Sequence, residues 1–220
     1  MTTERFRDRA DAGRQLADRL GGYAGRDDVV VLGLPRGGIP VAHEVAERLG
    51  APLDVFVVRK LGVPGQEELA MGAIASGDVR VLNEDVVRML AIPPETVEAV
   101  ARLERRELER REREYRGGRA PVDVRGKAVV LVDDGLATGA TMRAAAAALR
   151  QRGPARLIIA VPTAAPETCQ TLAADADEIA CVTTPEPFYA VGFWYDDFSE
   201  TTDAEVHDLL RRAAARRRAA

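Results

Sequence analysis

The sequence of 220 residues predicts one α/β domain with a central, mostly parallel sheet flanked by helices. Continuous apolar runs of strand length, such as 29–34 and 128–132, are typical of strands that are covered on both faces. Segments with apolar residues at helical spacing lie between these runs. Apolar residues make up 46% and charged residues 30% of the chain, which indicates a globular protein with a sizeable core rather than a disordered one.

The N-terminal half begins with alternating helices and strands. Apolar and small residues at helical spacing predict a helix over 6–20, which Gly21 and Gly22 end. A strand over 29–34 follows, and with the next helix and strand it forms a β-turn-α-β unit of the kind that pairs in parallel. In order, we expect a turn over 35–38, a helix over 40–49 closed by Gly50, a strand over 55–58, a mobile loop over 62–68, and two hairpin strands over 71–75 and 79–82.

A strongly charged helix is predicted over 94–116. Between Glu104 and Glu114, five arginines and five glutamates surround Leu108, so the charges cancel. Glu107 and Arg111 have the favourable i,i+4 order, as do Glu109 and Arg113. A nucleic-acid stripe would be mostly basic, and we therefore interpret this segment as a solvated structural helix.

The α/β alternation resumes after a linker over 117–126. We expect strands over 128–132, 157–161 and 178–182, helices over 141–152 and 166–174, an aromatic segment over 187–198, and a short helix from Asp203. The arginines at its end either complement the helix C-terminus or lie in solvent; they are Arg211, Arg212, Arg216, Arg217 and Arg218. The whole chain, 1–220, is expected to be one domain with a core over about 25–185, the charged helix as an insertion, and a small hood over about 186–220 together with the N-terminal helix.

Composition excludes several classes of function. The formal net charge of −4 gives no global basic field for nucleic acid. Cys169 and Cys181 do not suggest a disulfide scaffold or a metal site, and neither His43 nor His207 has partners at zinc-ligand spacing. The charged N-terminus does not start a secretory signal, and no apolar run reaches membrane-spanning length. We therefore expect a soluble, cytoplasmic protein with no membrane partner.

The segment 128–142 carries the chemistry. An apolar strand delivers Asp133 and Asp134 to its carboxyl end, where open α/β sheets bind ligands. A loop of small and hydroxyl residues, 137–141, then enters a helix, and its backbone N–H groups suit a phosphate. The carboxylates would repel that phosphate and so are expected to face ribose hydroxyls or Mg²⁺. The alternative that they only end a strand and cap a helix stays open from these residues alone, whereas a P-loop and a dinucleotide fingerprint are absent.

This segment resembles the phosphoribosylpyrophosphate-binding motif of type I phosphoribosyltransferases: four apolar residues, two acidic, two usually apolar, then a phosphate loop. Gly135 departs from the pattern, since an aliphatic residue is usual there. The turn with Arg36, Gly37 and Gly38 resembles the family's pyrophosphate-binding turn. Arg59-Lys60 resembles the pair before the catalytic flexible loop in adenine-type members. The resemblance covers about 29–183 and is nearest to an uncharacterised predicted phosphoribosyltransferase group.

The resemblance implies transfer of ribose 5-phosphate from phosphoribosylpyrophosphate to a nitrogen acceptor, with inversion at C1 and Mg²⁺-dependent release of pyrophosphate. Asp133 and Asp134 would hold the ribose hydroxyls, directly or through water on the metal. Arg36, Gly37, Gly38, Arg59 and Lys60 would bind pyrophosphate, and Glu67 or Glu68 would transfer a proton with the acceptor. The 5-phosphate would lie on Ala137, Thr138, Gly139, Ala140 and Thr141. Family members are typically homodimers, so we expect a homodimer.

The acceptor is expected to be a nucleobase. Ala137 stands where 6-oxopurine enzymes commonly carry an aspartate, so the phosphate loop is of the adenine type. Aromatic hood residues could stack on a planar base, or they could form only a small hydrophobic subcore: Phe188, Tyr189, Phe193, Trp194 and Tyr195. A second function, a regulator that binds phosphoribosylpyrophosphate without turnover, also remains. The N-terminal helix is too short and too charge-balanced to bind DNA, which favours the enzyme.

Overall fold

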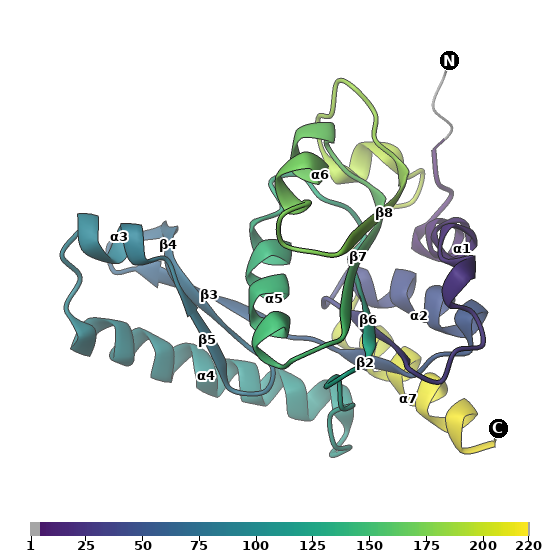
Figure 1. The fold of residues 1–220 in the computed structure, drawn as a ribbon, viewed down its shortest axis with the longest axis horizontal. Coiled ribbons are helices and arrows are strands. Elements are labelled where there is room, and N and C mark those ends of the chain that lie inside the picture. Colours follow the sequence, from purple (N-terminus) through teal and green to yellow (C-terminus); the bar gives the residue numbers. More distant parts are fainter. Residues whose placement is uncertain (1–4, 220) are drawn as a thin grey trace.

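The structure is a computed structural model that describes residues 5–219, with side chains as far as 216, and it has a body and an arm (Figure 1). The body is built on a five-stranded sheet in the order β2-β1-β6-β7-β8, in which every pairing is parallel. The arm, residues 58–116, contains a separate antiparallel sheet in the order β3-β4-β5. The predicted fold class is confirmed, because a parallel central sheet is flanked by helices.

The centre of the body is formed by β1 (Val29–Gly33) and β6 (Ala128–Val132), whose residues are all buried. The two strands pair from Val29 opposite Ala128 to Gly33 opposite Val132, so their carboxyl ends lie side by side. The sheet continues beyond β1 with β2 (Leu53–Val55), and beyond β6 with β7 (Arg156–Thr163) and β8 (Glu178–Thr183). The strand order therefore reverses between β1 and β6, the position at which open α/β sheets bind ligands.

Each face of the central sheet is covered by its own helices. Val29 and Val31 share a hydrophobic cluster with α1 (Arg9–Arg19), α2 (Gly38–Leu49) and α7 (Asp203–Ala219). Val30 and Leu32 share another with α5 (Ala140–Gln151) and α6 (Pro166–Leu172). Because successive side chains of a strand point to opposite faces, the continuous apolar run of β1 supplies both clusters.

The arm extends away from the body, with α4 (Pro94–Arg116) along its length (Figure 1). Its sheet consists of β3 (Val58–Val63), β4 (Gln66–Ala75) and β5 (Val79–Leu82), and α3 (Glu84–Met89) lies at its end. The buried side chains of α4 include Val97, Ala101 and Leu108, which pack in one cluster with Leu61 and Val63 of β3. Most of the other side chains of α4 are charged, although Leu103 is also exposed, and the helix is confirmed over the expected range.

The hood, defined here as residues 184–202, contains a short 3-10 helix, η2 (Val191–Trp194). It packs on the N-terminal segment: Phe6 and Tyr195 form an isolated bridge, and with Ala12 they make a small hydrophobic cluster. The other 3-10 helix, η1 (Gly21–Tyr23), follows α1 near the N-terminus. None of the helices within 5–219 is both long and apolar enough to cross a membrane.

The C-terminal part of the range expected for the hood, 186–220, forms α7. The C-terminal helix α7 packs on α2, α4 and β2 instead, because Val206 and Leu210 are buried in the core. On its outer side, Arg211 and Arg212 pair with Asp208, and Arg216 pairs with Glu47. The side chains of Arg217 and Arg218 lie outside the described residues.

Two local predictions in the arm region are wrong. The strand expected over 55–58 is split, since β2 ends at Val55 and β3 begins at Val58. Phe56 and Val57, which connect the two strands, are also buried. The apolar run is therefore unbroken, and the sequence does not indicate where the chain passes from one sheet to the other. The loop expected over 62–68 is the end of a β-hairpin, in which Pro64 and Gly65 form the turn and Gly65 takes a φ of +80°. Helix α3 was not expected, although Asn83 caps it by accepting from the Val86 N–H.

Candidate active site

Asp133 and Asp134 follow β6 directly and lie against the turn that follows β1. A Cβ at Gly37 would collide with the Asp134 carboxylate. A Cβ at Gly38 would lie 2.8 Å from the Val132 carbonyl oxygen and 3.0 Å from Asp133 Oδ1. Glycine is therefore required at both positions by the close approach of the two segments. The structure thus brings the predicted pyrophosphate turn and the predicted aspartates to one edge of the sheet.

The two carboxylates are crowded and only partly compensated. Burial raises the pKa of Asp133 well above its ordinary value, and the neighbouring charge of Asp134 adds to this shift. Burial also raises the pKa of Asp134, but the Arg9 guanidinium opposes that shift. The Asp134 N–H donates to Asp133 Oδ1 at 2.9 Å. The raised pKa values mean that ionising both carboxyls costs free energy. A cation or hydroxyl donors would stabilise the ionised pair, so the site is suited to either.

Arg9 was not identified from the sequence as a neighbour of this pair, and Tyr195 was expected only on the acceptor side. Arg9 of α1 donates from Nε to Asp134 Oδ2 at 2.9 Å, stacks over the Phe198 ring at 4.0 Å and donates to the Ser199 carbonyl. The Tyr195 hydroxyl donates to the Asp134 carbonyl oxygen at 2.6 Å. No sequence signal links Arg9 to Asp134, because they are 125 positions apart and arginine is common throughout this chain.

The phosphate loop, 137–141, forms the entry to α5. Gly139 has a φ of +69°, a left-handed conformation that favours glycine, and it is the N-cap of the helix. Behind the loop, the Thr168 hydroxyl donates to the Ala137 carbonyl oxygen at 2.5 Å. Ala137, Thr138, Ala140 and Thr141 are exposed. Since the first N–H groups of a helix lack intrahelical partners, this exposed entry is suited to an anion.

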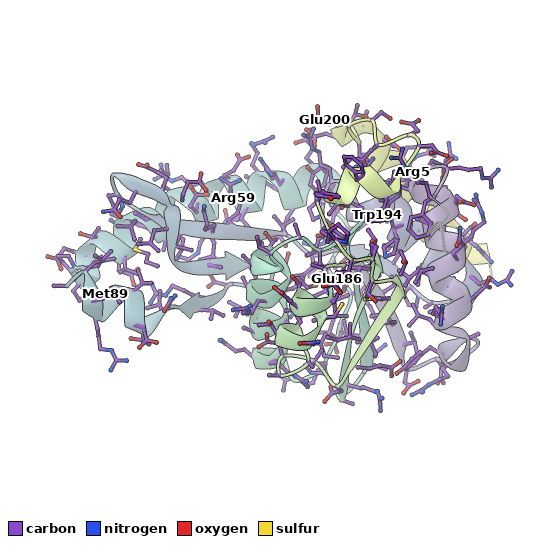
Figure 2. All side chains as sticks on the ribbon, turned by 90° about the horizontal axis from the view of Figure 1, so that it is seen from above. Arg5, Arg59, Met89, Glu186, Trp194 and Glu200 are labelled. Carbon is purple, nitrogen blue, oxygen red and sulfur yellow. The ribbon has the colours of Figure 1, made fainter. Side chains whose placement is uncertain are left out.

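The predicted basic residues are held by acidic partners. Arg36 forms an ion pair with Glu200 of the hood. Arg59 donates from Nε to Glu104 of α4 at 2.7 Å, and Lys60 lies 3.3 Å from Glu68 on β4. Figure 2 shows Arg59 on the arm, apart from Trp194 and Glu200 of the hood. Arg36 thus lies in the turn beside the aspartates, whereas the Arg59 guanidinium is held on the arm by Glu104.

The two candidate proton-transfer residues lie on the hairpin of the arm. Glu67 accepts a hydrogen bond from the Gly65 N–H at 3.2 Å, and the Glu68 side chain is fully exposed apart from its contact with Lys60. Neither is among the hydrogen-bond partners described for Asp133, Asp134 or the phosphate loop. Their role in proton transfer with the acceptor therefore stays a prediction.

The five aromatic residues proposed for the acceptor are divided between the surface and the interior. Tyr189 is 71% and Phe193 is 55% exposed, and their rings pack at 5.7 Å. Phe188 stacks on Trp194 at 6.3 Å. Tyr195 is only 3% exposed and packs between Phe6 and Phe198, so its ring is not available to a planar ligand in this arrangement. It belongs to the hydrophobic subcore that was the alternative interpretation, whereas Tyr189 and Phe193 do not.

The described residues hold no group of three or more His, Cys, Asp or Glu side chains placed to bind a metal. A metal at this edge would therefore take its protein ligands from Asp133 and Asp134 alone. This suits Mg²⁺, which is commonly bound through one or two carboxylates together with water and substrate phosphates.

Comparison with known proteins identifies the family of the chain. Residues 3–196 match the phosphoribosyl transferase domain family. The chain is 51% identical over 208 residues to a Mycobacterium tuberculosis protein named as a candidate phosphoribosyl transferase, covering 94% of this chain and 47% of that protein. It thus spans about half the length of this curated relative. It is also 35% identical over 134 residues to the bifunctional protein PyrR of Chloroflexus aurantiacus, covering 56% of this chain and 63% of PyrR.

One solved structure shares nearly the whole fold. The protein TT1426 of Thermus thermophilus is 46% identical, with a TM-score of 0.85 over 94% of this chain and 98% of that one. The AQ2163 protein of Aquifex aeolicus, at 15% identity and a TM-score of 0.50 over 92% of this chain and 84% of that one, shares the fold alone. Because the family model matches residues 3–196, the chain belongs to the phosphoribosyl transferase domain family.

Proposed function

We propose that this protein transfers the ribose 5-phosphate of phosphoribosylpyrophosphate to a nitrogen acceptor, a nucleobase, and releases pyrophosphate. One observation carries the proposal: Asp133 and Asp134 lie against Gly37 and Gly38 and next to the phosphate loop, at the edge where β1 and β6 end. A ligand that combines a ribose, a 5-phosphate and a pyrophosphate has one group for each of these three parts.

The loop and the two carboxylates divide the ligand between them. The exposed entry of α5 would hold the 5-phosphate through backbone N–H groups and the hydroxyls of Thr138 and Thr141. The Asp133 and Asp134 carboxylates would accept hydrogen bonds from the ribose 2′ and 3′ hydroxyls. Holding the ribose at both ends fixes C1 relative to the departing pyrophosphate and to the acceptor, which supplies catalysis by positioning.

The chemistry separates charge, because the ribose ring becomes positive while pyrophosphate leaves as an anion. Arg36 and the Gly37 N–H would bind the departing pyrophosphate, whereas the Gly38 N–H already donates to the Leu34 carbonyl oxygen at 3.0 Å. The carboxylates fit Mg²⁺, since oxygen ligands suit this ion and a cation would relieve the raised pKa of Asp133. When bound, Mg²⁺ would neutralise the leaving group. Arg59 and Lys60 would join this site only after exchanging Glu104 and Glu68 for the ligand.

The hood supplies the acceptor side of the proposal. The exposed rings of Tyr189 and Phe193 offer faces for stacking on a planar base. These features support a heterocyclic base, and Ala137 supports one of the adenine type.

Calorimetry with phosphoribosylpyrophosphate and Mg²⁺ tests the proposal. The double variant Asp133→Asn/Asp134→Asn should lose most of its affinity, with Kd at least about tenfold higher, because two charge-assisted hydrogen bonds are weakened. Asp27→Asn is the matched control, since Asp27 is exposed and precedes β1 at its other end. Equal affinity of the double variant and the control would show that this edge does not bind the ligand.

A regulator that binds phosphoribosylpyrophosphate without turnover is the alternative. The similarity of this chain to PyrR, a protein named bifunctional, supports this alternative. Release of pyrophosphate on mixing the protein with Mg²⁺, phosphoribosylpyrophosphate and a panel of nucleobases distinguishes the two. Release with one base supports the enzyme, and tight binding without release for any base supports the regulator.

The enzyme is proposed to act as a homodimer. Met89 at the end of the arm is 80% exposed, and Leu103 on α4 is 66% exposed. Exposed apolar side chains of this size on one extended element support an interface with a second copy. Light scattering on the purified chain measures the mass, and a monomer at micromolar concentration would contradict this expectation.

A further inference from the structure

The two cysteines of the chain lie next to each other although they are 12 positions apart. Cys169 is on α6 and Cys181 is on β8, and both are free thiols in the structure. Their sulfur atoms are 3.3 Å apart, closer than ordinary sulfur–sulfur contact. Both side chains are partly exposed, so small oxidants have access to them. A disulfide needs a sulfur–sulfur distance of about 2.05 Å, and a movement of roughly 1 Å would supply it.

We propose that Cys169 and Cys181 form a reversible disulfide that fixes α6 behind the phosphate loop. The geometry that carries this is the direct contact of the sulfurs between a helix and the neighbouring strand. It is a modification site separate from the aspartates, and its formation does not depend on the function proposed above. Its effect on ligand binding does rest on that function.

The environments of the two thiols differ in the way that disulfide formation requires. The hydrogen bond from Cys181 lowers the pKa of Cys169 to about 7. The same contact and burial raise the pKa of Cys181. A thiolate is the attacking species, and a pKa near the ambient pH gives the fastest attack. The lowered pKa of Cys169 favours it as the attacking thiol, with Cys181 as the resolving one.

The reaction balances with a peroxide as the oxidant. The Cys169 thiolate attacks one oxygen of hydrogen peroxide, the O–O bond breaks, and hydroxide leaves and takes up the proton that Cys169 had lost, which gives water and a sulfenic acid. The Cys181 sulfur then attacks the sulfenic sulfur. The S–O bond breaks, and hydroxide leaves with the Cys181 proton as a second water. Two thiols are oxidised by two electrons in total, and the peroxide is reduced to two waters.

The disulfide would act on the phosphate loop through Thr168, the residue before Cys169. The Thr168 hydroxyl donates to the Ala137 carbonyl oxygen at 2.5 Å, and its methyl group lies 2.8 Å from the position of a Cβ on Gly139. Leu172, one turn further along α6, lies 3.2 Å from the same position. Helix α6, which carries Cys169, thus packs directly against the loop 137–141. A disulfide to β8 would hold α6 in its observed position.

The first experiment asks whether the disulfide forms. The full chain is treated with hydrogen peroxide, and its intact mass and tryptic peptides are measured before and after reduction with dithiothreitol. We expect loss of two hydrogen atoms, a peptide pair linking Cys169 to Cys181, and full recovery on reduction. Cys181→Ser should instead accumulate the sulfenic acid or its further oxidation products. Added oxygen on Cys169 in the wild type, or a disulfide between two chains, would overturn the proposal.

The second experiment asks whether the disulfide reaches the loop. Calorimetry with ribose 5-phosphate compares the oxidised and reduced wild type. We expect about threefold tighter binding after oxidation, because a restrained α6 lowers the cost of ordering the loop. Thr168→Val is the matched control: it keeps both cysteines and the packing contacts with Gly139 but removes the hydrogen bond to Ala137, so oxidation should change its affinity less than that of the wild type.

The results of the two experiments distinguish failure of the disulfide proposal from failure of the proposed function. Unchanged or weaker binding after complete oxidation would overturn the link to the loop. Failure of ribose 5-phosphate to bind in either state would overturn the proposed function, and the mass measurement would still decide whether the disulfide forms. Cys169→Ser/Cys181→Ser reports the effect of peroxide on the rest of the chain, such as oxidation of the exposed Met89 to its sulfoxide, and its affinity for ribose 5-phosphate should not change.

Discussion

At the scale of single residues, the site depends on side chains that neutralise or approach the two aspartates. Arg9 is the cationic partner of Asp134, and both side chains are largely buried, with exposed fractions of 12% and 15%. Tyr195 fixes the Asp134 backbone from the other side. The N-terminal helix and the hood thus contribute to the site electrostatically and by packing, without themselves being part of the motif.

Arg9→Met should destabilise the protein by about 1–3 kcal/mol, because it leaves a largely buried carboxylate without its partner. Urea unfolding measures this change. Arg7→Met is the matched control: Arg7 is 73% exposed and pairs with Asp11 one turn away, so its loss should cost less than about 1 kcal/mol. Equal effects of the two variants would show that the Arg9–Asp134 pair behaves as an ordinary surface ion pair.

Gly139→Ala should weaken the binding of ribose 5-phosphate by about tenfold or more, since the new Cβ would press on Thr168 and Leu172 and move the loop. Gly153→Ala is a control with nearly the same backbone, because Gly153 has a φ of +68° but only Arg125 Cγ at 4.0 Å from the Cβ position. Both variants carry the left-handed strain, and Gly139→Ala adds the contact with Thr168, so it should lose at least as much thermal stability as Gly153→Ala. Calorimetry should show lost affinity only for Gly139→Ala.

At the scale of elements, α4 and α7 are joined by a polar contact inside an apolar region. The Tyr115 hydroxyl near the end of α4 donates to Asp203 Oδ1 at the start of α7 at 2.6 Å. Tyr115 is only 1% exposed, and burial together with this hydrogen bond raises its pKa to about 12. The neutral phenol is therefore the form that the folded protein accommodates.

The alkaline stability of the protein should report this contact. Because the pKa of Tyr115 is higher in the folded than in the unfolded chain, its stabilisation is complete below about pH 10 and is lost as the pH rises through about 12. Tyr115→Phe has no such ionisation. The difference in melting temperature between wild type and Tyr115→Phe should favour the wild type at pH 9 and shrink towards pH 12. A difference that stays constant over this range would contradict the role of Tyr115.

The sequence predicted most elements because their signals are local. The strand over 128–132 is confirmed at both ends, as is the helix over 94–116. The same local signals failed where tertiary pairing decides the outcome. An apolar run cannot reveal that Val55 and Val58 belong to different sheets, and Pro64-Gly65 is equally compatible with a mobile loop and a tight hairpin turn.

The site was predictable to the same degree. Asp133, Asp134 and the phosphate loop are contiguous, and the strand before them predicts their place at the sheet edge. Gly37 and Gly38 follow a second strand whose parallel pairing brings them to the same edge. Arg9 could not be found because its contact depends on how α1 packs, and the ion pairs of Arg59 and Lys60 depend on the arm.

At the scale of the whole molecule, the arm and the body meet at a buried ion pair. Arg116 at the end of α4 donates from Nε to Asp54 Oδ1 of β2 at 3.0 Å, with exposed fractions of 8% and 9% for the two side chains. The Val122 N–H in the linker donates to Asp54 Oδ2 at 3.0 Å. Arg116 also donates to the Val55 carbonyl oxygen and to Glu112. One carboxylate thus connects the parallel sheet, the charged helix and the chain that returns to β6.

Arg116→Met should destabilise the protein by about 3–5 kcal/mol in urea unfolding, because it removes one partner and leaves Asp54 buried with its charge. Asp54→Asn in the same chain removes that charge while an amide oxygen can still accept from Val122. The double variant Arg116→Met/Asp54→Asn should therefore lose less stability than the sum of the two single variants, by about 1–3 kcal/mol. Arg110→Met, which breaks exposed pairs with Glu107 and Glu114 on the same helix, should cost less than about 1 kcal/mol. Strictly additive effects would mean that the arm is held to the body by apolar packing alone.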